Sequence, residues 1–232
     1  MKTWRTSKGT MIYRLPGGRS HSFLIRTGNH TFLVDTGHRI MLKILLKQIR
    51  RAGVQKIDYL ILTHTHFDHA GNAASFKERF GLRIIVHQSE AELLKKGENP
   101  PVAGTIAPTR FLARLFARTQ TLFRYQAVEP DILAGREFDL TPLGISGHIL
   151  HTPGHTQGSV SVVIENEIAI VGDTLFGMFP GSIFPPFGQN LPQIIESWGL
   201  LAGTGCKVFL PAHGGERNLD LLYKQHRKYT RG

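Results

Sequence analysis

The feature that most constrains this sequence is a run of four metal-binding side chains within six residues, His64-Thr65-His66-Phe67-Asp68-His69. The run follows the apolar stretch Tyr59-Leu60-Ile61-Leu62, which is typical of a buried strand. It therefore lies where a strand leaves the core and a loop can carry side chains into a cleft. Imidazole and carboxylate groups together suit a zinc-type divalent ion. The run thus indicates the metal site of a metal-dependent hydrolase rather than a polar loop with ordinary surface histidines.

Three later segments repeat this arrangement of an apolar strand followed by a turn with a metal-binding side chain. His155 lies in a Pro/Gly turn, Asp173 ends the strand-like run Ile168-Ala169-Ile170-Val171, and His213 follows Val208-Phe209-Leu210. One such case would be weak evidence, because histidine-rich loops also arise from biased composition. Four cases on one chain predict that the strand ends meet at a shared metal site.

The motifs HTHFDH, HTPGHT, GDTLF and PAHG, in this order, resemble those of the metallo-β-lactamase superfamily, and the resemblance spans nearly the whole chain. It implies an α+β fold, a four-layer αββα sandwich. It also implies one domain over residues 1–232, with a helical, lid-like insertion at about 88–136. The metal ligands that it implies are His64, His66 and His155 for a first ion, Asp68, His69 and His213 for a second, and Asp173 as a bridge between them.

The implied cofactors are two divalent metal ions, expected to be Zn²⁺, with Fe or Mn as alternatives. His64 and His66 are two residues apart, so their side chains point the same way on an extended segment. A water between two such cations loses a proton near neutral pH and would be the bridging hydroxide that attacks the substrate. Asp68 is expected to be catalytic as well as a ligand.

Differences from particular branches of the superfamily disfavour some of its activities. Diiron oxidoreductases carry Glu where this chain has His66, which disfavours a diiron oxidoreductase. Many true β-lactamases carry Cys where this chain has Asp173, which disfavours a β-lactamase. The segment around GDTLF is similar to the glyoxalase II branch, which hydrolyses thioesters of glutathione. That branch usually adds a C-terminal helical domain, whereas only 19 residues follow His213 here, so glutathione specificity is not expected.

The leading interpretation is therefore a dinuclear hydrolase that cleaves a thioester, lactone or other ester-like bond of a small molecule. A phosphodiesterase or nuclease of the same fold is one alternative, favoured by the net charge of +11. A non-catalytic metal-binding protein is another, although the complete ligand set argues against it. Persulfide oxidation at a single iron is a more distant alternative.

Composition adds limits on partners and compartment. The sequence shows none of the aromatic–basic interleaving of RNA-binding modules, so a nucleic-acid partner is not favoured. It has no run of 18 apolar residues, no apolar signal-peptide region after Met1, and only one cysteine. These features predict a cytoplasmic protein without a transmembrane segment. The oligomeric state is left open.

The hydrophobic pattern predicts two similar halves, each mostly strands followed by helix, and hence two sheets packed face to face with helices outside. The predicted strands lie near 10–15, 21–27, 31–36, 57–62, 83–86, 145–150, 160–164, 167–171 and 207–210. The predicted helices lie at 39–52, after Gly71, at 192–202 and at the C-terminus.

Residues 110–124 form a basic amphipathic pattern, with Arg110, Arg114 and Arg118 on one stripe and Phe111, Leu112, Leu115 and Phe116 on the opposite one. Such a helix could be a lid, a membrane contact or a surface helix whose apolar face packs on the domain. We favour packing on the domain.

Other features support the site less directly. Asp35, in a Val-Asp-Thr-Gly turn, is expected to support a ligand rather than to bind metal. His87, His148 and His151 fit either a supporting or a purely structural role. The apolar segment from Phe176 to Phe187 either lines a pocket beside the metals or is a well-packed loop.

Overall fold

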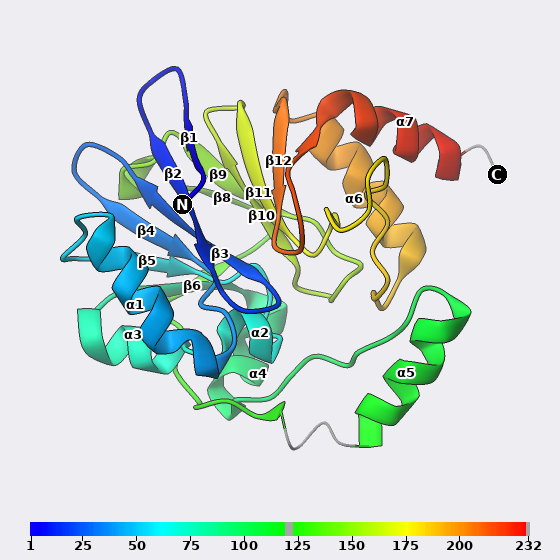
Figure 1. Ribbon diagram of the computed structural model, residues 1–232, viewed down its shortest axis with the longest axis horizontal. Coiled ribbons are helices and arrows are strands. Elements are labelled where there is room, and N and C mark those ends of the chain that lie inside the picture. The colour runs from blue at the N-terminus through cyan, green and yellow to red at the C-terminus, as the bar shows by residue number, and fades with distance from the viewer. Residues whose placement is uncertain (119–122, 231–232) are drawn as a thin grey trace.

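The computed structural model describes residues 1–118 and 123–230 and shows two β-sheets packed face to face, with helices on both outer faces (Figure 1). This order of layers confirms the predicted α+β fold of an αββα sandwich.

The first sheet contains seven strands in sequence order. The first four pair antiparallel, and the following three continue in parallel. The parallel part needs crossover connections, which helices supply. The strands are β1 (Thr3–Arg5), β2 (Met11–Pro16), β3 (His21–Arg26), β4 (Thr31–Val34), β5 (Tyr59–Ile61), β6 (Arg83–His87) and β7 (Ile132–Ala134).

The second sheet contains six strands in the order β13-β12-β11-β10-β9-β8. Its pairs are antiparallel except for β11 with β12, which are parallel and are connected through a helix. The strands are β8 (Glu137–Asp139), β9 (Gly147–His151), β10 (Val160–Ile164), β11 (Ile168–Gly172), β12 (Val208–Pro211) and β13 (Arg217–Asn218).

The helices divide between the two outer faces. Figure 1 shows α1 and α3 on the outer side of the first sheet and α6 and α7 on the outer side of the second. The helices are α1 (Leu42–Arg51), α2 (Phe67–Ala70), α3 (Ala73–Phe80), α4 (Ala91–Lys96), α5 (Ala107–Arg118), α6 (Leu191–Ala202) and α7 (Leu219–Thr230).

The alternation of side chains along single strands builds the layers. Phe23 and Ile25 of β3 face the second sheet, whereas Leu24 between them packs toward α1. In β10, Val162 faces the first sheet and Val163 packs toward Trp198 and its neighbours on α6. Because successive side chains of a strand point to opposite faces, each central strand contributes to two cores.

The predicted elements that have regular patterns are present, with ends shifted by a few residues. The pattern missed short elements, including β1, β7, β8, β13, α2 and α4. A strand of two or three residues is too short to display a period of two, and its position depends on the neighbouring strand.

The expectation that the predicted helix at 110–124 packs its apolar face on the domain is wrong. The helix is α5, which begins at Ala107; residues 119–122 of the predicted range lie outside the described residues. Phe111 is 66% exposed and Leu115 46% exposed, whereas the small side chain of Ala113 is buried. Figure 1 shows α5 standing at the edge of the molecule. That the segment acts as a lid stays a prediction.

Among the described residues, no helix combines the length and the apolar character needed to cross a bilayer.

Candidate metal centre

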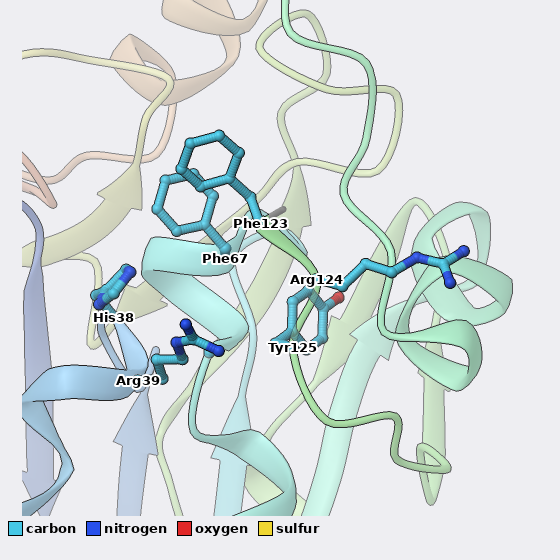
Figure 2. A pocket seen from close by; sticks show the side chains of 7 residues that line it. His38, Arg39, Phe67, Phe123, Arg124 and Tyr125 are labelled. Atoms are coloured by element: carbon cyan, nitrogen blue, oxygen red, sulfur yellow. The ribbon is translucent and has the colours of Figure 1, made fainter. Parts of the chain in front are cut away.

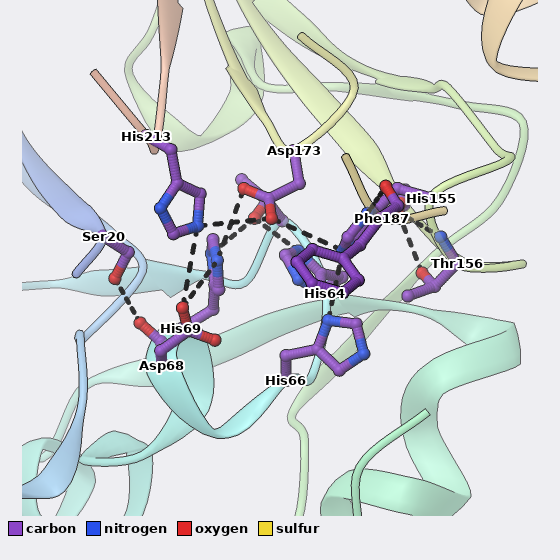
Figure 3. A network of polar contacts seen from close by, with 12 residues as sticks. Ser20, His64, His66, Asp68, His69, His155, Thr156, Asp173, Phe187 and His213 are labelled. Carbon is purple, nitrogen blue, oxygen red and sulfur yellow. Dashed lines mark hydrogen bonds and ion pairs between the residues drawn. The ribbon is translucent and has the colours of Figure 1, made fainter. Parts of the chain in front are cut away.

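The predicted metal-binding residues meet at one edge of the two sheets (Figure 3). The HTHFDH run follows β5, and its last residues form the short helix α2. His155 lies in the turn between β9 and β10, while Asp173 and His213 follow the parallel strands β11 and β12. The ends of these strands therefore deliver ligands from both sheets to one place.

Three groups of three side chains each bring one possible ligand atom within 4.8 Å of the others; one of them, His64 with His69 and Asp173, connects the two triads described next. The first triad is His64, His66 and His155; the second triad is Asp68, His69 and His213. In the first triad, Nδ1 of His66 lies 3.1 Å from Nε2 of His155. These are the two groups that the sequence assigned to separate ions.

Asp173 lies between the two triads. Its Oδ1 is 3.5 Å from Nε2 of His69, and its Oδ2 is 3.3 Å from Nε2 of His213 and 3.5 Å from Nε2 of His155. One carboxylate thus faces both triads, as a bridging ligand must.

Each histidine of this site other than His66 has its Nδ1 next to an oxygen atom. Nδ1 of His69 donates to Asp35 over 2.8 Å, and Nδ1 of His213 donates to the backbone carbonyl of Arg19 over 2.9 Å. Nδ1 of His155 donates to the carbonyl of Phe187, and Nδ1 of His64 lies 3.2 Å from the hydroxyl of Thr63. These contacts fix the rings and turn their Nε2 atoms toward the centre, the arrangement typical of metal-binding histidines.

The two triads differ in charge. Burial and the neighbouring histidines hold the pKa values of His64 and His66 well below the usual value, so both rings are neutral at pH 7. Burial alone would lower the pKa of His69, but Asp173, Asp35 and Asp68 raise it to about 10. The pKa of His213 is also raised, because Asp173 outweighs its burial.

The carboxylate of Asp173 is charged despite being buried. Burial alone would raise its pKa, but His213, His69 and His155 hold it well below the usual range. A buried anion among imidazoles is the charge pattern that a divalent cation would complete.

The residues present fit divalent metal. Nε2 of His64, Nε2 of His69 and Oδ1 of Asp173 are buried and have no hydrogen-bond partner among the described residues. Buried polar atoms are rarely left without a partner, since each costs about 1–3 kcal/mol. Three such atoms converging on one point indicate a cation as the missing partner.

The local backbone explains why these residues can approach. Asp35 adopts φ 59°, in the left-handed region, and accepts hydrogen bonds from both the amide and the hydroxyl of Thr63. Gly172 has φ 50°, and a Cβ there would lie 2.7 Å from Oγ1 of Thr63. Asp35 thus supports His69 as predicted, and a glycine is needed directly before Asp173.

Glu90 is a supporting residue that the sequence reasoning missed. Its buried carboxylate accepts hydrogen bonds from the amide and hydroxyl of Thr65, between His64 and His66, and from the amide of Gly158 after His155. It therefore ties together the two loops that form the first triad. The available signal was its position just after the strand β6, at the same edge of the sheet.

The remaining predicted features have simple outcomes. His87 and His151 stack on each other with ring centroids 4.0 Å apart rather than touching a ligand. Phe176 is buried and stacks on the His213 ring at 4.9 Å, whereas Met178 and Phe179 are more than half exposed. The apolar segment after Asp173 thus contacts the ligands at its two ends, through the ring of Phe176 on His213 and the carbonyl of Phe187 on His155.

A small pocket of about 110 Å³ lies beside α2. Figure 2 shows His38 and Arg39 on one side of it, the rings of Phe67 and Phe123 together on another, and the Arg124 side chain extending away. Arg124 forms an ion pair with Glu98. At this volume the pocket is too small for a whole ligand of drug-like size.

Fold and site together define a protein with a buried His/Asp centre at the edge of an αββα sandwich. The family model described as the metallo-beta-lactamase superfamily matches residues 15–213. The chain belongs to this superfamily, and it is a metallo-hydrolase by that membership.

Comparison with individual proteins supports the same class. The chain is 32% identical over 217 residues to a probable metallo-hydrolase of Methanocaldococcus jannaschii. The matched region covers 93% of this chain and 92% of that protein. It is 27% identical to an acyl-coenzyme A thioesterase of Homo sapiens, over 92% of this chain and 79% of that protein. The crystal structure of the B3 metallo-beta-lactamase BLEG-1 superposes with a TM-score of 0.72 at 19% identity, covering 95% of this chain and 100% of that chain.

Proposed function

We propose that this chain is a dinuclear metallo-hydrolase that cleaves the thioester bond of a small acyl thioester. The observation that carries the proposal is the pair of triads facing one carboxylate, Asp173, with unpartnered ligand atoms between them. His64, His66 and His155 would hold one ion, and Asp68, His69 and His213 the other. Zn²⁺ is the proposed ion, because its preferred ligands are imidazole and carboxylate in such a mixture.

Two such ions, when bound, supply a water with a lowered pKa and polarise the substrate carbonyl. The chain's own residues hold the geometry around this chemistry. Asp173 keeps the two ligand sets together, and Phe176 covers the ring of His213 and limits access of water on that side. Asp35, the carbonyl of Arg19 and the carbonyl of Phe187 fix three imidazoles in the orientation that exposes Nε2.

Asp68 has a role beyond ligation in this proposal. Its side chain is 16% exposed, compared with 6% for Asp173, and its Oδ2 lies 3.6 Å from Nε2 of His213. Among the carboxylates of the site, Asp68 is therefore the one nearest to solvent. Because Oδ2 faces His213 and would hold the ion, we assign to the other oxygen, Oδ1, the uptake of the proton that the attacking water loses and its delivery to the thiolate that leaves.

The choice of a thioester rests on the similarity to a relative named as an acyl-coenzyme A thioesterase and on the GDTLF segment. The thioester therefore has to be tested against lactones and phosphodiesters, the other bonds that this fold cleaves.

The test combines metal content with a substrate panel. Protein purified without added metal should contain about two divalent ions per chain by elemental mass spectrometry. It should release free thiol from acyl-coenzyme A substrates, and a chelator should remove both the ions and the activity. Faster turnover of a phosphodiester or a lactone, one iron per chain with oxygen consumption, or folded protein that binds no metal would each overturn the proposal.

A further inference from the structure

We propose that α5 (Ala107–Arg118) docks the protein onto an anionic lipid surface. This proposal does not depend on the metal chemistry. It starts from the finding that the apolar side of α5 faces solvent rather than the domain.

The arrangement of side chains around α5 separates three faces. Ala113 is buried and marks the side that touches the body of the molecule. Phe111 is 66% exposed, Leu112 42% and Leu115 46%, and these residues form an adjacent apolar side. Because residues three and four apart share a helix face, Arg110 and Arg114 form a third, exposed side next to Phe111. A helix with an apolar side bordered by arginines suits the boundary between lipid headgroups and acyl chains.

The charge around α5 favours lipid over other occupants. Between Asn99 and Val128 the sequence contains four arginines and no acidic residue, and the whole chain carries a net charge of +11. A second copy of the chain would bring the same arginines against this surface and so meet like charge. Anionic lipid supplies the opposite charge at the same depth at which it accepts Phe and Leu side chains.

The structure also fixes α5 to the rim of the metal centre. The amide and hydroxyl of Thr105 donate to the carbonyls of Pro186 and Pro185, and the amide of Gly188 donates to the carbonyl of Ala103. Between these contacts, the carbonyl of Phe187 accepts the hydrogen bond from Nδ1 of His155. A membrane bound by α5 would therefore lie beside the first triad, and a substrate that partitions into lipid would arrive close to the site.

The helix α1 provides a matched control, because it is also basic and amphipathic. Its apolar side packs on the core through Leu45 and Ile49, yet Ile44 is 44% exposed and Lys47 is exposed. The substitutions Ile44→Ser and Lys47→Glu thus remove the same kinds of group, at similar exposure, as Leu115→Ser and Arg114→Glu do on α5.

The experiment measures flotation of the full chain with vesicles of phosphatidylcholine, with and without phosphatidylserine. The unchanged chain should float only with vesicles that contain phosphatidylserine, and less so as salt is added. Phe111→Ser combined with Leu115→Ser should lower partitioning by about tenfold or more. Arg114→Glu should lower it by roughly 25-fold, since it changes the charge by two units and each unit near the surface contributes about fivefold.

The two α1 variants should bind vesicles as the unchanged chain does, and circular dichroism should show that all variants are folded. Absence of binding to phosphatidylserine vesicles would overturn the proposal, as would equal losses in the α1 and α5 variants. A dimer that Phe111→Ser and Leu115→Ser convert to monomer, without any vesicle binding, would assign the same surface to a second copy of the chain and overturn it as well.

Discussion

The two triads of the metal centre each bring three ligand atoms within 4.8 Å of one another but differ in the state of their protons. The first triad contains neutral imidazoles, because burial and neighbouring histidines lower the pKa values of His64 and His66. In the second triad, the carboxylates raise the pKa of His69 to about 10. An ion entering the first triad therefore finds its ligands ready, whereas an ion entering the second must displace a proton. The two triads therefore bind metal under different conditions, although their ligand atoms are similarly spaced.

The largest effect is expected from Asp173→Ala, which should remove the difference between the triads. Because the carboxylate faces both, its loss should release both proposed ions and lower thioester turnover at least about a thousandfold. Elemental analysis and turnover measure this. Asp220→Ala, an exposed acidic residue on α7, is the control and should change neither. Two retained ions and full turnover in Asp173→Ala would refute the assignment of this residue.

Next in size is the contrast between His155→Ala and His213→Ala. Each variant lacks one triad and should hold about one ion, with turnover reduced roughly a hundredfold. The ion left in His155→Ala should bind more weakly as pH falls from 9 to 7, because it competes with the proton on His69. The ion left in His213→Ala should be nearly indifferent to pH over the same range. Identical pH dependence in the two variants would break the comparison.

A smaller effect is expected from Asp35→Asn. Asparagine tolerates the left-handed backbone at this position, so the variant should fold. Loss of the charge beside Nδ1 of His69 should lower the affinity of the second ion by about 10- to 100-fold. Glu90→Gln is the matched control, since Glu90 is also buried but bonds Thr65 and Gly158 rather than an imidazole. Competition with a chelator measures both, and an equal loss in Glu90→Gln would contradict the special role of Asp35.

The smallest effect is a proton count. Calorimetric titration of metal into the metal-free chain at pH 8, in buffers with different ionisation heats, should show release of about one proton from the second triad. Titration of His213→Ala, which keeps only the first triad, should release almost none. Release of no proton by the unchanged chain would show that His69 is not protonated before metal binds.

The same difference sets the stability of the metal-free chain against pH. His69 has a raised pKa in the folded state, so its stabilisation is present below pH 6.5 and is lost as the pH rises through about 10. His64 and His66 have lowered pKa values, so the folded state loses stability as the pH falls below 6.5.

Most of the metal centre was predictable because its ligands follow strands with strong patterns. Each ligand segment combines an apolar run with a Gly/Pro turn, and both signals are local in the sequence. Glu90 was not predictable in this way, because its partners Thr65 and Gly158 are 25 and 68 residues away. Only the folded arrangement shows that one carboxylate reaches both loops.

The orientation of α5 illustrates a second limit. The sequence predicts a helix at both α1 and α5, and both helices are present, basic and amphipathic. Leu45 of α1 is fully buried, whereas Leu115 of α5 is 46% exposed. Periodicity indicates that a helix has an apolar side but carries no information about what covers that side.

The division of ligands between the two sheets has a mechanical consequence. Each triad takes two side chains from residues 64–69 and its third from the other half of the chain, and His66 and His155 are 89 residues apart. An ion held there would link the two halves of the chain at this edge of the sheets, as a disulfide does in other proteins. This chain cannot form an internal disulfide, because Cys206 is its only cysteine. Unlike a disulfide, such a tether would open under a chelator and not under a reductant. The availability of metal would then set how firmly the two sheets are clamped together.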